Sequence, residues 1–413
     1  MSNATGHAPS LYGGEYFHYF SELYEPIHLP LSLIICLLGV AANTSNVIVL
    51  TRRSMITPTN VVLTGLSAAQ LFLLVNYLLL LTFNVCARNC ILPELHSYTA
   101  MTYKWINVNV SVAFHTTALC HTLVLAIFRF LAVQAPTFTR ANLNARAARF
   151  SVLILHLTVP VLCVPTFFTS YVAPVKRISP EDRCGYPTAY DLDYVAEAYL
   201  IEVAMWTFGI VFKLIPSILI VVLSFYLIVS LKKYNDKKDR LTGKKGQEEV
   251  SSKSKPFRQQ GSGRQALKKD GATESLNKQG SIRAPPEERI AKKRNARSAL
   301  TKMLVIVALF CAAVELPHGI VNLLTAIFGQ EFGMEVYDNL GDFFEMLTLL
   351  YSSVNFVLYC AMSTEFQRTF RQLFCAPVRD VCMYRLLGRP MPIKKNNDPT
   401  TYLYRSSYTE TAY

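Results

Sequence analysis

Charged residues are scarce in this chain. Asp, Glu, Lys and Arg make up 17% of its 413 residues, whereas hydrophobic residues make up 51%. Soluble globular domains usually contain about 25% charged residues. The composition therefore argues against a soluble globular protein and favours one that is embedded in a membrane.

The motifs of several membrane-protein classes are also missing. Neither H-E-x-x-H nor G-x-S-x-G occurs, so two common hydrolase signatures are absent. Residues 343–362 contain no lysine, which excludes a retinal Schiff base in the last apolar stretch. His115 and His121 lie about 120° apart on a helix and do not form a shared metal site. We therefore expect no enzyme activity, no cofactor and no metal.

The net positive charge of the chain is concentrated in one segment. Residues 232–298 hold twenty Lys or Arg and eight Asp or Glu, and thus +12 of the net charge of +13. This basic segment lies between two apolar stretches and lacks the interleaved aromatic residues of a nucleic-acid site. We therefore expect no nucleic-acid partner.

Seven apolar stretches are each long enough to cross a bilayer core of about 30 Å. Several contain proline, which spanning helices tolerate because neighbouring helices and water satisfy the freed carbonyl groups. The sequence therefore predicts an all-α membrane protein, a seven-transmembrane helix bundle. The stretches are residues 29–50, 61–85, 106–133, 150–172, 196–231, 299–328 and 343–362.

The charges of the loops predict the orientation of the bundle. Residues 1–28 contain no Lys or Arg, whereas alternate connections carry arginines and the long basic segment. Because basic loops stay in the cytoplasm, we expect the N-terminus outside the cell and the C-terminus inside. No cleavable signal peptide is visible, so the first span should serve as the insertion signal. The outer triplet that begins at Asn3 is either a glycosylation site or a chance occurrence.

These features divide the chain into six parts. The basic segment has few large apolar residues and should be disordered. Phenylalanines at helical spacing after the last span are typical of a helix on the membrane surface. The parts are an extracellular N-terminal segment (1–28), transmembrane helices one to five (29–231), a disordered basic intracellular loop (232–298), transmembrane helices six and seven (299–362), a short cytoplasmic amphipathic helix (363–375) and a cytoplasmic tail (376–413).

Three ionisable residues fall in the middle of the membrane: His115, Lys213 and Glu315. Such residues are rare inside a bilayer and are usually functional. By helical rise Lys213 and Glu315 lie at similar depth on neighbouring spans, so they can pair. The alternative is that Glu315 is neutral and bonded to another neighbour.

Several motifs resemble the rhodopsin-like G-protein-coupled receptors, over about residues 29–375. They are Gly39-Val40-Ala41-Ala42-Asn43, Phe128-Arg129-Phe130, Pro216, Pro317 and the run from Asn355 to Tyr359. Other segments resemble more narrowly the myosuppressin and FMRFamide-like neuropeptide receptors of invertebrates. These are Thr51-Arg52-Arg53, Pro58-Thr59-Asn60, Lys213-Leu214-Ile215-Pro216, Glu315-Leu316-Pro317-His318-Gly319 and Asn355-Phe356-Val357-Leu358-Tyr359.

The resemblance implies how a signal crosses the bundle. It assigns contact with a heterotrimeric G protein to Arg129, although a snorkelling arginine that anchors the helix is the alternative. Gln70 stands where the family has a sodium-binding aspartate, so we expect it to hydrogen-bond to Asn43 or Asn355 instead. The resemblance also implies a group of activation-switch residues: Lys213, Glu315, Pro317, Asn355 and Tyr359.

The cysteines suit an exported membrane protein. The family's disulfide joins the outer loop before the fifth span to the top of the third span, where this chain has Lys104. Cys184 is therefore expected to pair with Cys90 or Cys86, and we favour Cys90. Cys375 and Cys382 follow the amphipathic helix and are either palmitoylated or free thiols. Palmitoylation and free thiols both stay open for these two cysteines.

The resemblance also implies a ligand, a secreted amidated peptide ending in Arg-Phe-amide. Its arginine needs carboxylates that can be reached from outside, since charge-assisted hydrogen bonds are strong. The alternative is that these carboxylates are solvated loop charges. The residues assigned to ligand binding are Glu202, Asp342, Glu345, His115 and Phe114.

On this interpretation the chain is a multi-pass receptor of the plasma membrane. Its partners are the peptide and the G protein, with an arrestin and a receptor kinase acting at the Ser- and Thr-containing tail. Two other functions stay open. A chemosensory receptor for a small molecule has the same architecture. A proton-coupled transporter can use Glu315, Lys213 and His115, although transporters are commonly built from repeated halves that this sequence lacks.

Overall fold

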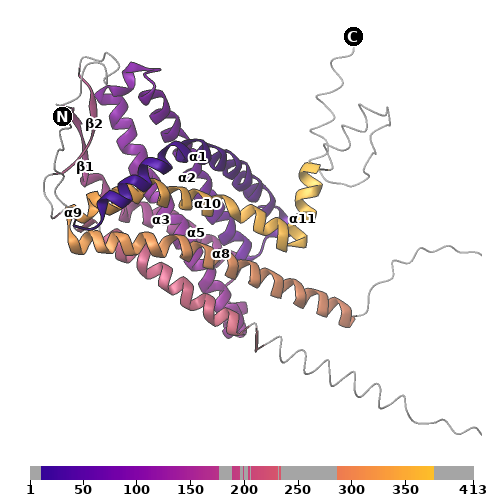
Figure 1. Cartoon of the computed structure of the whole chain (residues 1–413). Helices are drawn as coiled ribbons and strands as arrows, with labels where there is room; N and C mark the ends of the chain where they lie inside the picture. Colours follow the sequence, from indigo (N-terminus) through magenta and orange to yellow (C-terminus); the bar gives the residue numbers. More distant parts are fainter. Residues whose placement is uncertain are drawn as a thin grey trace, which may run out of the picture. The chain divides into compact units, whose positions relative to one another are not determined.

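The computed structural model describes residues 11–175, 188–195, 199, 203–204, 206–230, 232–233 and 286–375. The chain forms two units, Met1–Thr364 and Glu365–Tyr413, which are described separately. Among the described residues of the first unit, seven helices are long and apolar enough to cross a membrane, which confirms the predicted bundle (Figure 1). These spans are Gly14–Leu50, Pro58–Arg88, Tyr98–Gln134, Ala145–Phe168, Thr207–Ser230, Thr301–Phe328 and Gly333–Ala361.

Polar side chains mark where several helices begin. Thr57, Ser97 and Asn144 each accept a hydrogen bond from an amide in the following turn, which caps α2, α3 and α5. The labelled elements are α1 (Gly14–Leu50), α2 (Pro58–Arg88), α3 (Tyr98–Gln134), α4 (Pro136–Asn142), α5 (Ala145–Leu162), β1 (Ser170–Pro174), β2 (Tyr190–Tyr194), the π-helical η4 (Thr207–Leu214), α8 (Pro286–Phe328), α9 (Gln330–Phe332), the π-helical η5 (Gly333–Tyr337) and α10 (Asp338–Met362).

The first and last spans lie side by side. α1 packs against α10, and a Cβ atom on Gly39 would collide with the Ser353 hydroxyl. Glycine is therefore required for this close approach of the two helices. The Asn43 amide fixes the pair further, because it donates a hydrogen bond of 2.8 Å to the carbonyl of Ser352.

A two-stranded antiparallel hairpin adds a small β element to the predicted all-α fold. β1 and β2 pair with Ser170 opposite Tyr194, so residues 170–172 are strand where the sequence predicts the end of the fourth span. The hairpin covers the start of α3, where the Trp105 indole donates to the carbonyl of Ser170 at 3.0 Å. We call the end of the bundle that holds β1, β2 and α9 the hairpin end, and the opposite end the far end (Figure 1).

α8 begins earlier than the sequence predicts. It begins at Pro286, within the loop 232–298 that we expected to be disordered. Residues 286–298 are rich in Glu, Ala, Lys and Arg, which favour helices, and proline suits a first helical turn. Residues 286–298 were missed because the prediction of disorder was made from the composition of the whole loop, which is mostly polar.

α1 also begins early, at Gly14 instead of near Leu29. The segment before it is held by Glu335, whose carboxylate accepts hydrogen bonds from the amides of Leu11 and Tyr12. Residues 14–28 of the predicted N-terminal segment are therefore helical, because a helix that spans the bilayer extends beyond its apolar run where neighbouring residues support it.

The second unit contains the amphipathic helix that the sequence predicts after the last span. α11 (Thr364–Phe370) continues into a π-helical turn, Arg371–Cys375. Three phenylalanines form one row along it, with ring centroids 6.5 Å apart between Phe366 and Phe370 and 4.8 Å apart between Phe370 and Phe374. Cys375 is an exposed free thiol, which lipidation requires. Cys382 lies outside the described residues.

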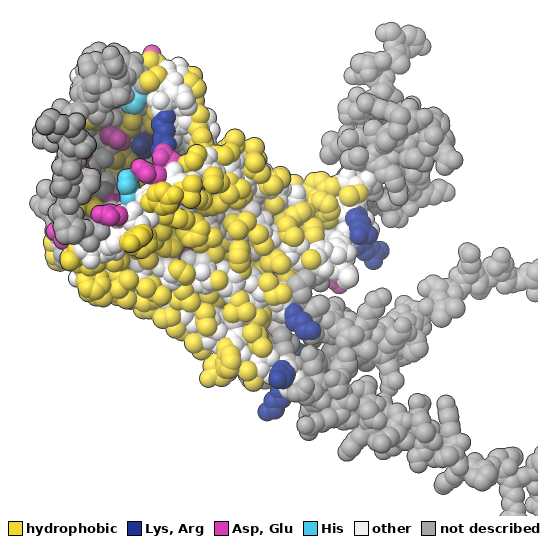
Figure 2. All heavy atoms as spheres, viewed as in Figure 1, with side chains coloured by type: hydrophobic (Ala, Val, Ile, Leu, Met, Phe, Trp, Pro, Cys, Tyr) yellow, Lys and Arg dark blue, Asp and Glu magenta, His cyan; other side chains and the backbone are white. Residues whose placement is uncertain are grey.

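The surface of the bundle separates apolar from charged side chains. Hydrophobic side chains cover the visible flank, while acidic and histidine side chains gather at the hairpin end beside a few basic ones, and further basic side chains lie at the far end (Figure 2). An apolar flank between two charged ends is what a bilayer requires of a protein that spans it.

Gln70 and Asn355 form a buried polar pair inside this apolar bundle. Both are almost fully buried, and the Asn355 amide donates a hydrogen bond of 2.7 Å to the side-chain oxygen of Gln70. Of the two partners predicted for Gln70, Asn355 is therefore the observed one. The pair joins α2 to α10.

Replacing Gln70 alone by leucine should lower the free energy of unfolding by about 1–3 kcal/mol, since the buried Asn355 amide then loses its acceptor. The double variant Gln70→Leu, Asn355→Leu should recover much of this loss because neither polar group remains. Thermal unfolding of the detergent-solubilised protein measures both. A double variant that loses as much stability as the sum of the two single variants would contradict the pairing.

Candidate functional site

A chain of buried and partly buried polar side chains links three helices in the hairpin half of the bundle. The Glu315 side chain is 1% exposed, and its Oε2 atom lies 3.2 Å from Nε2 of His115 on α3. Its other oxygen, Oε1, is buried without a hydrogen-bond partner among the described residues. The ammonium group of Lys213 lies 2.8 Å from a ring nitrogen of His318. We call His115, Glu315, His318 and Lys213 the buried polar chain.

This arrangement corrects the expected direct pairing of Lys213 with Glu315. The ammonium of Lys213 instead contacts His318, and Glu315 bonds to His115. Glu315 and His318 are three residues apart, so they share one face of α8 and stand next to each other. The spacing of Glu315 and His318 in E-L-P-H predicts that they lie next to each other, but His318 was given no role from the sequence.

Close packing brings Lys213 to α8. A Cβ atom on Gly319 would lie 3.4 Å from the Lys213 side chain and from the backbone of Leu214, so the fifth span and α8 are in close contact at this point. Lys213 itself lies in the π-helical η4. Single-turn π-helical segments are frequent at functional sites, because the extra residue redirects a side chain.

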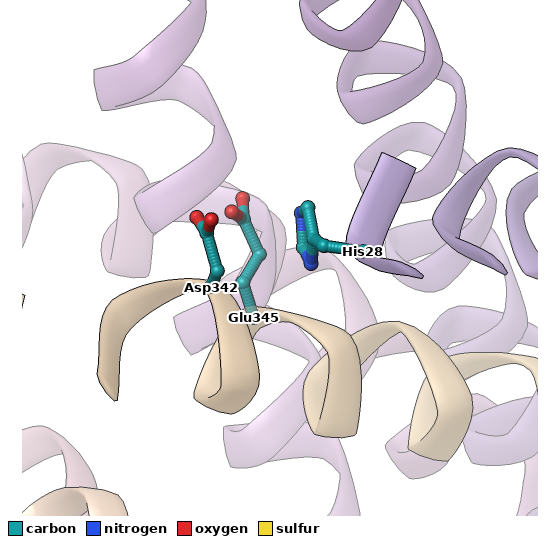
Figure 3. A group of neighbouring side chains, drawn as sticks. All are labelled: His28, Asp342 and Glu345. Carbon is teal, nitrogen blue, oxygen red and sulfur yellow. The ribbon is translucent and has the colours of Figure 1, made fainter. Parts of the chain in front are cut away.

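A second group of ionisable side chains lies between α1 and α10. Asp342 and Glu345 are three residues apart on α10, and we call them the acidic pair. The imidazole of His28 on α1 lies beside them (Figure 3), and one ligand-capable atom from each residue lies within 4.8 Å of the others. The acidic pair was predicted to bind ligand, whereas His28 was missed, because nothing in the sequence connects position 28 with position 342.

The two groups are linked through Phe344. Its ring stacks on the imidazole of His318 with a centroid distance of 4.7 Å and an interplanar angle of 5°. Phe344 is the neighbour of Glu345 in the chain and is 5% exposed. Through Phe344, α10 is therefore in direct contact with the buried polar chain.

Phe114 is not brought to either group. It stacks on Phe72 with centroids 5.2 Å apart, and Phe72 is 54% exposed on the flank of the bundle. His115 points inward instead, since successive residues of a helix differ by about 100° in direction. Glu202, the remaining predicted ligand-binding residue, lies outside the described residues.

Arg129 and Tyr359 lie near each other in the far half of the bundle. Arg129 is half-buried beside a small cavity whose lining comes from α3, the fifth span and α8. Tyr359 is 1% exposed and close enough to Arg129 for an electrostatic interaction. Pro317 lies inside α8, where it lacks the amide hydrogen of a regular helical turn.

The predicted covalent modifications are partly described. Cys90 is disulfide-bonded, whereas Cys86 is a free thiol. This agrees with the choice of Cys90, but its pairing with Cys184 stays a prediction because Cys184 lies outside the described residues. The same holds for glycosylation of Asn3.

Comparisons with known proteins identify the fold and the class. A family model for the serpentine type 7TM GPCR chemoreceptor Srw matches residues 30–255 and 278–377. The chain belongs to this receptor family. The expected class of G-protein-coupled receptor is thereby confirmed, and the rhodopsin-like subclass stays a prediction.

Individual relatives cover most of the receptor. It is 26% identical to the G-protein coupled receptor dmsr-1 of Caenorhabditis elegans, over 88% of this chain and 70% of that protein. Sex peptide receptor-related protein 2 of the same organism is 25% identical over 83% of this chain and 70% of its own length. The sex peptide receptor of Drosophila melanogaster is 24% identical to this chain, over 84% of this chain and 71% of that protein.

The buried polar chain makes a prediction about stability. His115→Ala should destabilise the receptor by about 3–5 kcal/mol, because it leaves the Glu315 carboxylate buried without its partner. Glu315→Gln should cost much less, since an amide keeps the shape and can still bond to His115. Thermal unfolding of the two purified variants compares them, and an equal loss in both would show that the charge of Glu315 does not need His115.

Proposed function

We propose that this receptor binds a secreted amidated peptide ending in Arg-Phe-amide at the hairpin end and activates a heterotrimeric G protein at the far end. The single observation that carries the proposal is the acidic pair. Asp342 and Glu345 lie together near the hairpin end, and no basic side chain of the described residues forms an ion pair with either.

Two adjacent carboxylates suit an arginine. A guanidinium group is planar and donates parallel hydrogen bonds, so it can bridge two acidic side chains in a way that an ammonium cannot. Three aromatic rings next to the pair suit the phenylalanine of the peptide. Phe20 and Tyr24 of α1 both contact Phe343 of α10 edge-on, with centroids 5.7 Å and 6.0 Å apart.

The names of two relatives support a peptide ligand. The sex peptide receptor of Drosophila melanogaster and the related protein of Caenorhabditis elegans are both named for a peptide. The similarity of this chain to them extends over more than four fifths of its length. Peptide binding is therefore the better supported ligand class.

The proposed signal passes from the acidic pair to the buried polar chain. Ligand contact with Glu345 moves α10, and the stack of Phe344 on His318 transmits this movement to α8. Rearrangement of Glu315 and Lys213 then changes the position of α8 about Pro317. Asn355 and Tyr359 follow on α10, and the outward movement of α8 opens the cavity beside Arg129 to the G protein.

The proposal places the receptor in the plasma membrane with its hairpin end outside the cell. Acidic side chains gather at that end beside a few basic ones, whereas the charged side chains visible at the far end are mostly basic, which supports this orientation (Figure 2). A receptor kinase and an arrestin are proposed partners of the C-terminal tail. We assign no catalytic reaction to the chain.

A second candidate is a chemoreceptor for a small molecule, which the description of the family favours. One screen separates the two candidates. Cells that express the receptor with each class of G protein are exposed to amidated peptides, to the same peptides with free carboxyl termini, and to small odorants. Activation by amidated peptides alone supports the first proposal, and activation by odorants alone overturns it.

Recognition of the peptide's arginine is tested by a double-mutant cycle. Glu345→Gln should weaken an Arg-Phe-amide peptide by roughly 30-fold or more, since truncating one partner of a buried charge pair typically costs about 2–5 kcal/mol. A peptide with citrulline in place of arginine should lose little further affinity on that variant. Independent effects of the two changes would mean that Glu345 does not bind the arginine. Glu335→Gln is the control, because Glu335 bonds to backbone amides instead.

Coupling to the G protein is tested at Arg129. Arg129→Ala should leave peptide affinity nearly unchanged and abolish nucleotide exchange on the G protein, because Arg129 lies in the far half of the bundle. Arg140→Ala, on the short helix α4 after α3, is a matched loss of positive charge. Normal exchange by Arg129→Ala at equal surface expression would remove Arg129 from the mechanism.

A further inference from the structure

His28 is a buried histidine to which the proposed function gives no role. It is 8% exposed, so the apolar interior of the bundle surrounds most of its ring. Its Nε2 atom lies 3.0 Å from the hydroxyl of Tyr77 on α2, while its Nδ1 atom is buried without a hydrogen-bond partner in the described part of the chain. Buried polar atoms are usually paired, so this nitrogen calls for an explanation.

Two carboxylates lie in the surroundings of His28. The carboxylates of Asp342 and Glu345 lie beside its imidazole (Figure 3), and one ligand-capable atom from each of the three residues lies within 4.8 Å of the others. The three side chains come from the first and last spans and meet only because α1 packs against α10.

We propose that His28, Asp342 and Glu345 bind a divalent transition-metal ion, for which zinc is the best match. Zinc takes imidazole nitrogen and carboxylate oxygen at about 2.0–2.2 Å, so its ligand atoms are roughly 3.3–3.5 Å apart in a tetrahedron. Small side-chain rotations bring the three atoms to that spacing. Calcium and magnesium prefer shells made of oxygen, and the imidazole favours zinc over both.

Tyr77 completes the chemistry of a metal site. A metal-binding histidine usually uses one ring nitrogen for the ion and the other for a hydrogen bond that fixes the ring. His28 has this division, with one nitrogen bonded to Tyr77 and one without a partner. The Tyr77 hydroxyl also lies close enough to the Glu345 carboxylate to interact with it. It thus contacts two of the three proposed ligands from a third helix.

The charge balance of this region also favours a cation. Asp342 and Glu345 share one face of α10, where two negative charges repel each other. Arg88 is the basic residue near His28, but its guanidinium bonds to Glu25 at 2.6 Å. A divalent ion offsets both carboxylates without drawing Arg88 away.

The proposal departs from the expectation of no metal, which considered only His115 and His121. It does not rest on a peptide ligand, although both proposals use the acidic pair. If both hold, zinc and the peptide's arginine compete for the same carboxylates. Their tests are separate, because zinc binding is measured here without any peptide.

The experiment is a titration of the purified full-length receptor with zinc chloride alone, followed by calorimetry. The wild type should show one saturable site that a tenfold excess of magnesium does not block. His28→Ala and Glu345→Gln should each weaken zinc binding at least about tenfold, since each removes a ligand. His18→Ala is the matched control, because His18 also lies on α1 but pairs with the exposed Glu22.

Each outcome decides the proposal. Equal zinc affinity in the wild type, His28→Ala and Glu345→Gln would place the ion elsewhere, for example on thiols, and overturn the site. Absence of saturable binding would overturn it as well. Should His28→Ala fail to fold, Glu345→Gln and Asp342→Asn carry the test, because both keep the size of the side chain. A normal zinc titration with no coupling to the citrulline peptide would remove the peptide proposal alone.

Discussion

The carboxylate of Glu315 is the constraint on which the rest of the bundle depends. A charge buried among apolar helices must be compensated inside the protein, because no water reaches it. His115 supplies the partner from α3, and His318 and Lys213 extend the polar contacts to the fifth span. One acid thus draws polar side chains of two neighbouring helices toward α8, which constrains how α3, the fifth span and α8 are rotated about their axes.

The same constraint joins the two ionisable groups of the receptor. Phe344 of α10 stacks on His318 of the buried polar chain. The next residue of α10, Glu345, lies beside His28 in the proposed cation and peptide site. α10 therefore contacts both groups. Neither group can shift without the other responding. An ion at His28 would therefore hold α1 and α10 together and bias the position of α8 through this stack.

The sequence predicts the elements of this fold better than their contacts. The lengths of the apolar runs were enough to predict seven spans. Glu315 stood out as a candidate functional residue because acids are rare in membranes. The sequence does not give the rotation of each helix about its axis, so Phe114 was assigned to ligand binding although it stacks on Phe72 at the flank. His28 was missed because its partners are more than three hundred positions away. The helical start of α8 at Pro286 was hidden by averaging over a polar loop.

The packing of α1 on α10 has a consequence for biosynthesis. Of the seven spans, α1 is synthesised before the others and α10 after them, so the surface around Gly39 has no α10 to pack against until the other spans have been made. Until then the Asn43 amide lacks the carbonyl of Ser352, its partner in the finished bundle. In a truncated chain that ends before residue 338, the Asn43 amide would thus keep only its bond to the Gly39 carbonyl of its own helix. Insertion of α10 is the step that closes the protein.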